Sequence, residues 1–440
     1  MTISNTSASS GSSGPGDQRV FSTANHASLW FSLGVGLLVI QIGAYLVPGM
    51  GTRDAVFAIM AGSVLGAAVL AWVAHTACRT GLSSAGLIQR VYGPSFGRLP
   101  IFLNVVQLIG WTSFELVVMR DSTAAIVEKM LGISVSPWVT TSLWGGLLAL
   151  LMLAPMLTLV RQFVSRIGLP LVIASLAWLT WQFGRQLGEA GFSAFWNRTG
   201  DGTMGLLSGM DLVMAMPISW LPLIADYARH GKQASGAFWG TWGGYAIANM
   251  WCYGLGVLIA NTTAPGTDLV AALLLAQGGL IALGLIMIDE LDNAYGDLYS
   301  ASMSTRALQP PQARRQWSLK RIAIALAAVS TLIAVVLPMH QLEPFMLMLS
   351  AIFIPLYGTV LGTLWRTREA PSGRTQWPAF AIWITGIVVF NLIARLAPEW
   401  GATIPTLLLT IALARLRAQQ VLGCVYDWHF TALRTCHLMQ

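Results

Sequence analysis

Two groups of ionisable residues stand out because they fall inside long apolar stretches of the sequence. Glu115 follows Trp111 by four residues, and a second stretch contains Asp289, Glu290, Asp292, Asn293 and Asp297. Residues four apart share one face of a helix, so Trp111 is expected to lie beside Glu115. An aromatic ring next to a carboxylate suits a flat heterocycle, because the ring stacks and the carboxylate accepts its N–H groups. The alternative for Trp111 is ordinary packing in the core.

The second group predicts a polar stripe. Asp289, Asn293 and Asp297 follow one another at successive turns of a helix. Unpaired carboxylates are costly in lipid, so some of these acids are expected to be protonated, hydrated or bound to a cation. In the alternative interpretation the apolar stretch is shorter, and the acids lie at an aqueous mouth.

The elements that must position these residues are membrane helices. The chain has 440 residues, of which 55% are hydrophobic and only 10% charged, which is too few charges for a water-soluble surface. A spanning helix needs about 20 apolar residues, and backbone groups in lipid require helices or closed barrels. Continuous apolar runs favour an all-α polytopic membrane protein with twelve transmembrane helices. The runs, numbered one to twelve, are 28–47, 55–77, 99–119, 138–160, 168–186, 207–225, 238–260, 269–302, 319–338, 344–364, 377–394 and 400–414.

The distribution of charge predicts the orientation. Among the alternate loops of this arrangement, one set is rich in Arg and Lys, whereas the other is nearly neutral. Basic loops stay in the cytoplasm, so we expect a multi-pass protein of the bacterial inner membrane with both termini cytoplasmic. This placement explains the net charge of +7 without nucleic acid as a partner. Polar residues 1–25 are expected to form a disordered cytoplasmic tail, and residues 418–440 a second cytoplasmic tail.

Helices one and six carry signals of interruption. Helix one contains Gly34 and Gly36, and helix six contains Pro217 and Pro222. Broken helices at corresponding places in two repeats are typical of transporter sites, since freed backbone groups can bind a substrate or ion. Gly and Pro are also common in membrane helices without such a role.

Four short segments can be compared with known families: Leu29-Trp30-Phe31, Gln107-Leu-Ile-Gly110-Trp111, Ala225-Asp226-Tyr227-Ala-Arg229 and Leu298-Tyr299-Ser300-Ala301. Together they resemble the nucleobase:cation symporter family, which includes cytosine permease and carriers of allantoin and hydantoin. The resemblance covers roughly residues 26–365 and is closest to the putative hydroxymethylpyrimidine transporter branch.

The resemblance implies a five-plus-five inverted repeat of the LeuT-like fold. Repeat one would cover about 28–186, repeat two about 207–364, and two additional C-terminal helices about 377–414, within a transporter domain of residues 26–417. The substrate would lie between helices one, three, six and eight. The residues expected to bind it are Trp111, Glu115, Ser219, Trp220, Asp297, Gln41 and Gly43.

Two of these positions depart from the family pattern. Glu115 and Asp297 stand where the family has amides. Ionised carboxylates only accept hydrogen bonds, so they favour a substrate rich in donors or a protonated one. A 4-aminopyrimidine such as hydroxymethylpyrimidine, a thiamine precursor, fits this requirement, whereas uracil and hydantoins fit it less well. A cytosine or purine permease is the alternative.

The resemblance also implies a coupling cation. The family's hydroxyl ligands on helix eight fall at Leu291 and Asp292, so the hydroxyls are missing. Sodium could use Asp292 and the backbone from Gln41 to Ala44, or a proton could be carried by Asp292, Asp297 or Glu115. We expect Asp289, Asp292, Asn293 and Ala44 to take part in coupling, with Na⁺ or H⁺ as the ion.

Other classes of protein fit less well. The phosphate-binding motif GxxxxGK[ST] is missing, which argues against an ATP-driven pump within this chain. The histidines lack metal-ligand spacing, so neither a metal, an organic cofactor nor an enzymatic activity is expected. A channel would need a continuous polar stripe rather than a mid-membrane cluster. The partners expected are therefore the lipid bilayer and a small pyrimidine.

Overall fold

The computed structural model describes residues 19–153, 168–188, 191–264, 266–338, 341–365 and 376–436, the last sixteen of these as backbone only. Within these ranges the secondary structure is helical, apart from an isolated bridge between Phe21 and Gly231. Seven helices are long and apolar enough to cross a membrane, or eight if one bent pair is a single span. Helices satisfy their backbone internally, which explains why they dominate in a chain with so few charges.

The first half of the described chain contains the helices of the first repeat and their connections. They are α1 (Thr23–Ser32), α2 (Leu37–Tyr45), α3 (Thr52–Thr80), α4 (Ser84–Phe96), α5 (Arg98–Leu131), α6 (Pro137–Leu151) and α8 (Leu169–Gln186). Helix one is thus broken into α1 and α2, which are bent by 63° from one another. The break falls at Gly34 and Gly36, as the sequence predicts.

The second half repeats this order and adds two long helices. Its elements are α9 (Gly191–Trp196), α10 (Leu206–Ser219), α11 (Leu221–Ala228), α12 (Ala234–Thr262), α13 (Leu269–Leu275), α14 (Gly279–Leu308), α15 (Pro311–Gln316), α16 (Leu319–Val336), α17 (Leu342–Thr363), α18 (Trp377–Leu396), η3 (Pro398–Trp400) and α19 (Thr403–Cys436). Helix six is interrupted only at Trp220, and α10 and α11 form one span.

The expected runs and the observed helices differ in three places. Run eight, 269–302, is two helices, because Gly278 takes a left-handed conformation before α14. Run twelve, 400–414, is too short, since α19 continues to Cys436 through most of the expected tail 418–440. Run four ends with α6 at Leu151, and residues 154–160 lie outside the described ranges, as do residues 1–18 of the expected N-terminal tail.

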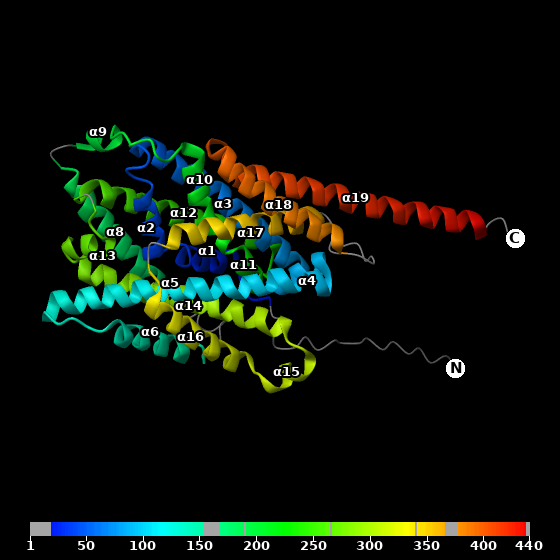
Figure 1. Cartoon of the computed structure of the whole chain (residues 1–440), viewed down its shortest axis with the longest axis horizontal. Coiled ribbons are helices and arrows are strands. Elements are labelled where there is room, and N and C mark those ends of the chain that lie inside the picture. Colours follow the sequence, from blue (N-terminus) through cyan, green and yellow to red (C-terminus); the bar gives the residue numbers. More distant parts are fainter. Residues whose placement is uncertain are drawn as a thin grey trace, which may run out of the picture.

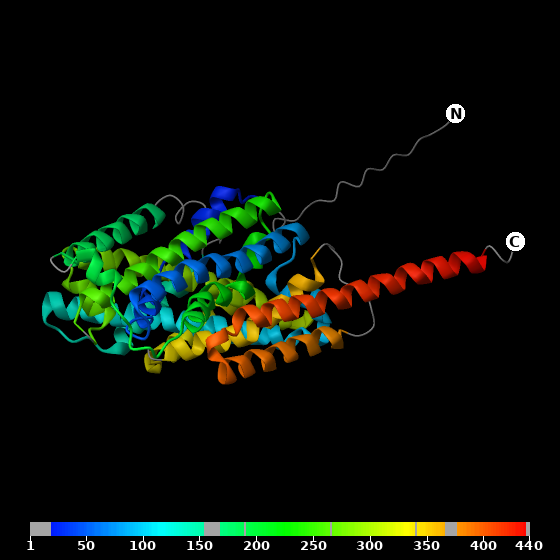
Figure 2. The same cartoon turned by 90° about the horizontal axis from the view of Figure 1, so that it is seen from above.

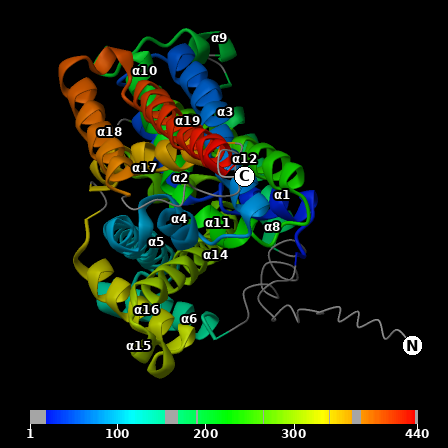
Figure 3. The ribbon, with the colours of Figure 1, turned by 90° about the vertical axis from the view of Figure 1, so that its right-hand side faces the viewer.

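The helices pack in two sets. In the first set, α3 and α12 lie side by side, with α1, α2, α10 and α11 against them; in the second, α5 packs along α14, with α6 and α16 beside them. Figure 3, a view along the bundle, shows the second set below the first. The C-terminal helices α18 and α19 pack on α17, which in turn contacts α10 of the first set.

The two ends of the bundle carry different connections. Figure 1 shows α9 and α13 at one end, and α4 and α15 at the other. The far end of α19 extends beyond the bundle on the side of α4 and α15 (Figures 1 and 2). We call these the α9 end and the α4 end. Arg79, Arg98, Lys232 and Arg306 flank helices at the α4 end, which is the basic end that the sequence predicts to be cytoplasmic.

Candidate functional site

The break in helix one lies against the acidic stretch of α14. The Ser32 hydroxyl donates a hydrogen bond of 2.7 Å to Asp289 at the end of α1. Beyond the break, the backbone N–H of Leu37 donates to Glu290. Between them, the Asn293 amide donates to the carbonyl of Val35 at 3.1 Å. Side chains of α14 therefore bind the polar backbone groups that the broken helix leaves free.

Two of the residues expected to couple a cation, Asp289 and Asn293, thus lie at the break itself. Glu290 also lies there, although the expected site omits it. The sequence contained a signal for it, since Glu290, Asn293 and Asp297 also fall on one helical face. Asp292 is half-buried, and one of its carboxylate oxygens has no hydrogen-bond partner.

The acids of α14 are enclosed by protein rather than placed at a surface mouth. Asp289, Glu290 and Asp297 are at most 5% exposed, and they lie in the middle of a helix of 30 residues. The shorter-helix alternative is therefore wrong for this structure. Arg120 forms an ion pair with Asp121 near the α9 end of α5. In the part of the chain that the structure describes, no basic side chain is paired with Asp289, Glu290 or Asp297.

Glu115 of α5 is part of the same buried acidic group. It is 2% exposed, and one of its carboxylate oxygens has no partner; the same is true of one oxygen of Asp297. The two carboxylates are near enough to interact electrostatically. Helices α5 and α14 pack along one another, which brings together two acids that are 182 residues apart in the sequence. Buried carboxylates without a partner are stabilised by a hydrogen-bond donor, by protonation or by a bound cation.

Trp111 lies one turn before Glu115 and is 5% exposed. Its ring packs edge-to-face on Phe345 of α17 at 5.4 Å between centroids, while its indole N–H has no hydrogen-bond partner. The ring therefore has both the packing contacts expected of a core residue and a free donor beside the acid pair.

The interruption of helix six places Ser219 and Trp220 near α5. The Ser219 hydroxyl donates to the carbonyl of Met216 in its own helix at 2.6 Å, and the Ser219 carbonyl accepts from Gln107 of α5 at 3.4 Å. The Trp220 ring packs edge-to-face on Trp30 of α1 at 6.1 Å. Both residues are buried where broken helix one meets helix six.

The residues expected on α2 have different surroundings. A Cβ on Gly43 would lie 2.3 Å from the carbonyl oxygen of Tyr253, so Gly43 permits α2 to cross α12 closely. Ala44 is half-buried near Gly256, again at this crossing. Gln41 is half-buried and points away from Gly43, because two residues rotate a helix by about 200°. Packing thus accounts for Gly43 and Ala44, and the acidic group lies on α14 and α5.

A further polar contact lies towards the α4 end. Asp226 of α11 accepts a hydrogen bond of 3.0 Å from the backbone N–H of Ser84 and one of 2.5 Å from the Ser300 hydroxyl. It therefore joins helix six to both α4 and α14. The motif around Asp226 carried the family resemblance, but its sequence did not reveal these partners.

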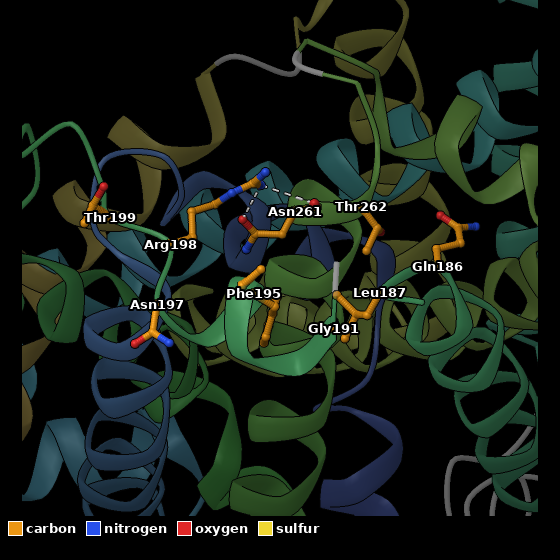
Figure 4. Close-up of a pocket in the computed structure, with 10 residues that line it drawn as sticks. Gln186, Leu187, Gly191, Phe195, Asn197, Arg198, Thr199, Asn261 and Thr262 are labelled. Carbon is orange, nitrogen blue, oxygen red and sulfur yellow. Dashed lines mark hydrogen bonds between the residues drawn. The ribbon is translucent and has the colours of Figure 1, made fainter. Parts of the chain in front are cut away.

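A surface cavity of about 440 Å³ lies elsewhere, at the α9 end. Its lining includes Phe195, Arg198 and Thr262, and Arg198 is held by hydrogen bonds of 2.7 and 3.2 Å to Asn261 (Figure 4). None of the expected site residues lines it. The cavity is therefore separate from the helix breaks, where the buried acids lie.

The sequence matches one protein family over residues 15–406, described as permeases for cytosine/purines, uracil, thiamine and allantoin. The chain belongs to this family. It is consequently a permease and not an enzyme, and its substrates are of the nucleobase type. No curated protein sequence matches the chain.

Solved structures give the same fold. Mhp1, a nucleobase-cation-symport-1 family transporter, in a closed conformation with bromovinylhydantoin bound, matches with a TM-score of 0.76 and 14% identity, over 94% of this chain and 96% of Mhp1. An inward-facing Mhp1 structure gives 0.72 and 16%, over 94% and 92%. A Na⁺-coupled sialic acid symporter gives 0.63 and 11%, over 91% and 90%. The permease therefore has the LeuT-like fold of two five-helix inverted repeats with additional C-terminal helices.

Proposed function

We propose that this permease is a secondary active importer of a 4-aminopyrimidine, with hydroxymethylpyrimidine as the favoured substrate. One observation carries the proposal. Glu115 on α5 and Asp297 on α14 are buried within electrostatic reach of each other, and each keeps a carboxylate oxygen without a partner. An exocyclic amine and a protonated ring nitrogen supply the donors and the positive charge that two desolvated carboxylates require.

The neighbouring side chains suit a flat ring. Trp111 offers an aromatic face one turn from Glu115, and its free indole N–H can donate to the substrate's hydroxyl or second ring nitrogen. Trp220 lies at the facing interruption of helix six. These positions support stacking of the pyrimidine between helices three and six.

We infer that transport is driven by a cation through alternating access. Four buried acids, Glu115, Asp289, Glu290 and Asp297, and the half-buried Asp292 lie among the described residues with no basic partner. Charge balance therefore supports uptake of H⁺ or Na⁺ together with the substrate. We place the carrier in the bacterial inner membrane with both termini cytoplasmic, because the basic loops gather at the α4 end.

The test is uptake of radiolabelled hydroxymethylpyrimidine and cytosine in cells that lack native carriers, with imposed Na⁺ or H⁺ gradients. Saturable uptake of hydroxymethylpyrimidine, competed only weakly by uracil, is the expected result. Uptake of cytosine alone would show that the carrier is instead a cytosine or purine permease. Uptake of neither compound would contradict the assignment of an aminopyrimidine substrate.

A further inference from the structure

Two pairs of side chains hold the two interrupted helices, and their positions correspond. At helix one, Glu290 accepts from the backbone N–H of Leu37, and Asn293 donates to the carbonyl of Val35 at 3.1 Å. A Cβ on Gly36 would lie 2.8 Å from the Glu290 carboxylate, so the break lies directly against α14. We call Glu290 and Asn293 the α14 clamp.

At helix six, the side chains come from α5. Asn104 donates to the carbonyl of Pro222 at 3.2 Å, and Gln107 donates to the carbonyl of Ser219 at 3.4 Å. These carbonyls flank Trp220, the residue that interrupts the helix. All four clamp side chains are buried. We call Asn104 and Gln107 the α5 clamp.

The two clamps are equivalent positions of the inverted repeats. Glu290 follows Asn104 by 186 residues, and Asn293 follows Gln107 by 186 residues. The same separation carries residues 34–36, the break of helix one, to residues 220–222, the interruption of helix six. Helix three of repeat one therefore holds helix six of repeat two, and helix eight of repeat two holds helix one of repeat one.

We propose that these four side chains are positioning residues that set which end of the carrier is open, and that the two clamps act in opposite directions. This inference depends on the alternating access proposed above but not on the identity of the substrate. Inverted symmetry exchanges the two ends of the molecule. If one clamp favours closure of one end of the carrier, the symmetry-related clamp therefore favours closure of the other end.

The half-helix that each clamp binds determines which end of the carrier that clamp keeps closed. The α14 clamp binds Leu37 at the start of α2, the half of helix one that leads to the α9 end. In the α5 clamp, Gln107 binds Ser219, the last residue of α10, and Asn104 binds Pro222 in α11, the half of helix six that leads to the α4 end. Loss of the α14 clamp should release α2 and open the α9 end. Loss of the α5 clamp should release α11 and open the α4 end.

The experiment measures both ends by pulsed electron paramagnetic resonance in nanodiscs, without substrate, in a variant whose four native cysteines are replaced. One spin-label pair, at Asp54 and Met130, reports the α9 end; the other, at Arg98 and Lys232, reports the α4 end. Each pair joins the first helix set to α5, and all four positions are exposed. Glu290→Ala/Asn293→Ala is compared with Asn104→Ala/Gln107→Ala.

We expect the first double variant to increase the long-distance population at the α9 end by about tenfold, as two lost hydrogen bonds imply, and the second to do so at the α4 end. Glu290→Gln with Asn293 intact should restore most of the original distribution. Asn249→Ala is the matched control: it removes a buried amide bond to Ser63 of 3.2 Å within the first set, and should shift neither end.

Shifts in the same direction for both double variants, or no shift in either, would overturn the proposal. If a double variant does not fold, the single variants Glu290→Ala and Asn104→Ala, which remove the contacts to Leu37 and Pro222, carry the same comparison. If the two double variants shift the distance distributions at opposite ends but hydroxymethylpyrimidine is not taken up, only the proposed substrate is rejected. Uptake of hydroxymethylpyrimidine with shifts of the same sign would reject only the clamps.

Discussion

Glu115 and Asp297 lie buried within electrostatic reach of each other on neighbouring helices, and each keeps one carboxylate oxygen unpaired. We expect Glu115→Gln and Asp297→Asn each to weaken the competition of hydroxymethylpyrimidine by about 10- to 100-fold, the range for a hydrogen bond to a charged group. The affinity for uracil should increase relative to that for hydroxymethylpyrimidine, because the amide introduced in each variant can donate a hydrogen bond to a uracil carbonyl.

Competition against a radiolabelled substrate in membrane vesicles measures both effects. Glu128→Gln, the same change at an exposed position of α5, serves as the control and should leave affinity unaltered. Wild-type affinity in both Glu115 and Asp297 variants would show that the acid pair does not bind the substrate.

Trp111 should contribute through its ring. Trp111→Phe retains an aromatic face and is expected to reduce affinity less than Trp111→Ala, for which the loss of an aromatic contact predicts roughly a 3- to 10-fold decrease. Equilibrium binding by scintillation proximity separates this effect from transport rate. Trp239→Ala, at a residue 60% exposed, is the matched control; equal effects at the two positions would assign Trp111 to packing alone.

The crossing of α2 and α12 requires glycine at position 43. Gly43→Ala places a methyl group 2.3 Å from the Tyr253 carbonyl oxygen, so we expect a loss of stability of about 1–3 kcal/mol from overpacking. Thermal unfolding in detergent, followed by size-exclusion fluorescence, is the measurement. Gly254→Ala on α12 has no atom within 4 Å of the added methyl and should preserve the wild-type midpoint. A stable Gly43→Ala protein that has lost binding would instead place Gly43 in the substrate site.

Asp211 joins α10 to the start of α19. Its carboxylate accepts hydrogen bonds from the backbone N–H groups of Ala402 at 2.5 Å and Thr403 at 3.2 Å. Asp211→Ala should cost about 1–2 kcal/mol, as for loss of a capping carboxylate, and should lower the unfolding midpoint. Glu128→Ala, at an exposed acid in the last turn of α5, provides the comparison, and identical midpoints for the two variants would argue against the cap.

The sequence alone predicted the broken form of helix one, because Gly34 and Gly36 weaken a helix locally. It also placed Asp289 and Asn293 on one face, since that inference needs only the 3.6-residue period. The same local reasoning overestimated the break of helix six: Pro217 and Pro222 are accommodated within a nearly continuous span, and only Trp220 departs from the helix. It also missed the turn after α13.

What the sequence by itself determined is the presence of long apolar stretches and their helical form, because lipid cannot hydrogen-bond to the backbone. The burial of the acids of α14, which the sequence left open, was decided by the tertiary structure. Only the tertiary structure decided which acid meets which backbone group. Glu290 reaches Leu37 across 253 residues, and Asn104 reaches Pro222 across 118. Such contacts depend on how the helices pack, which no local periodicity specifies, since many registers of packing bury the same apolar faces.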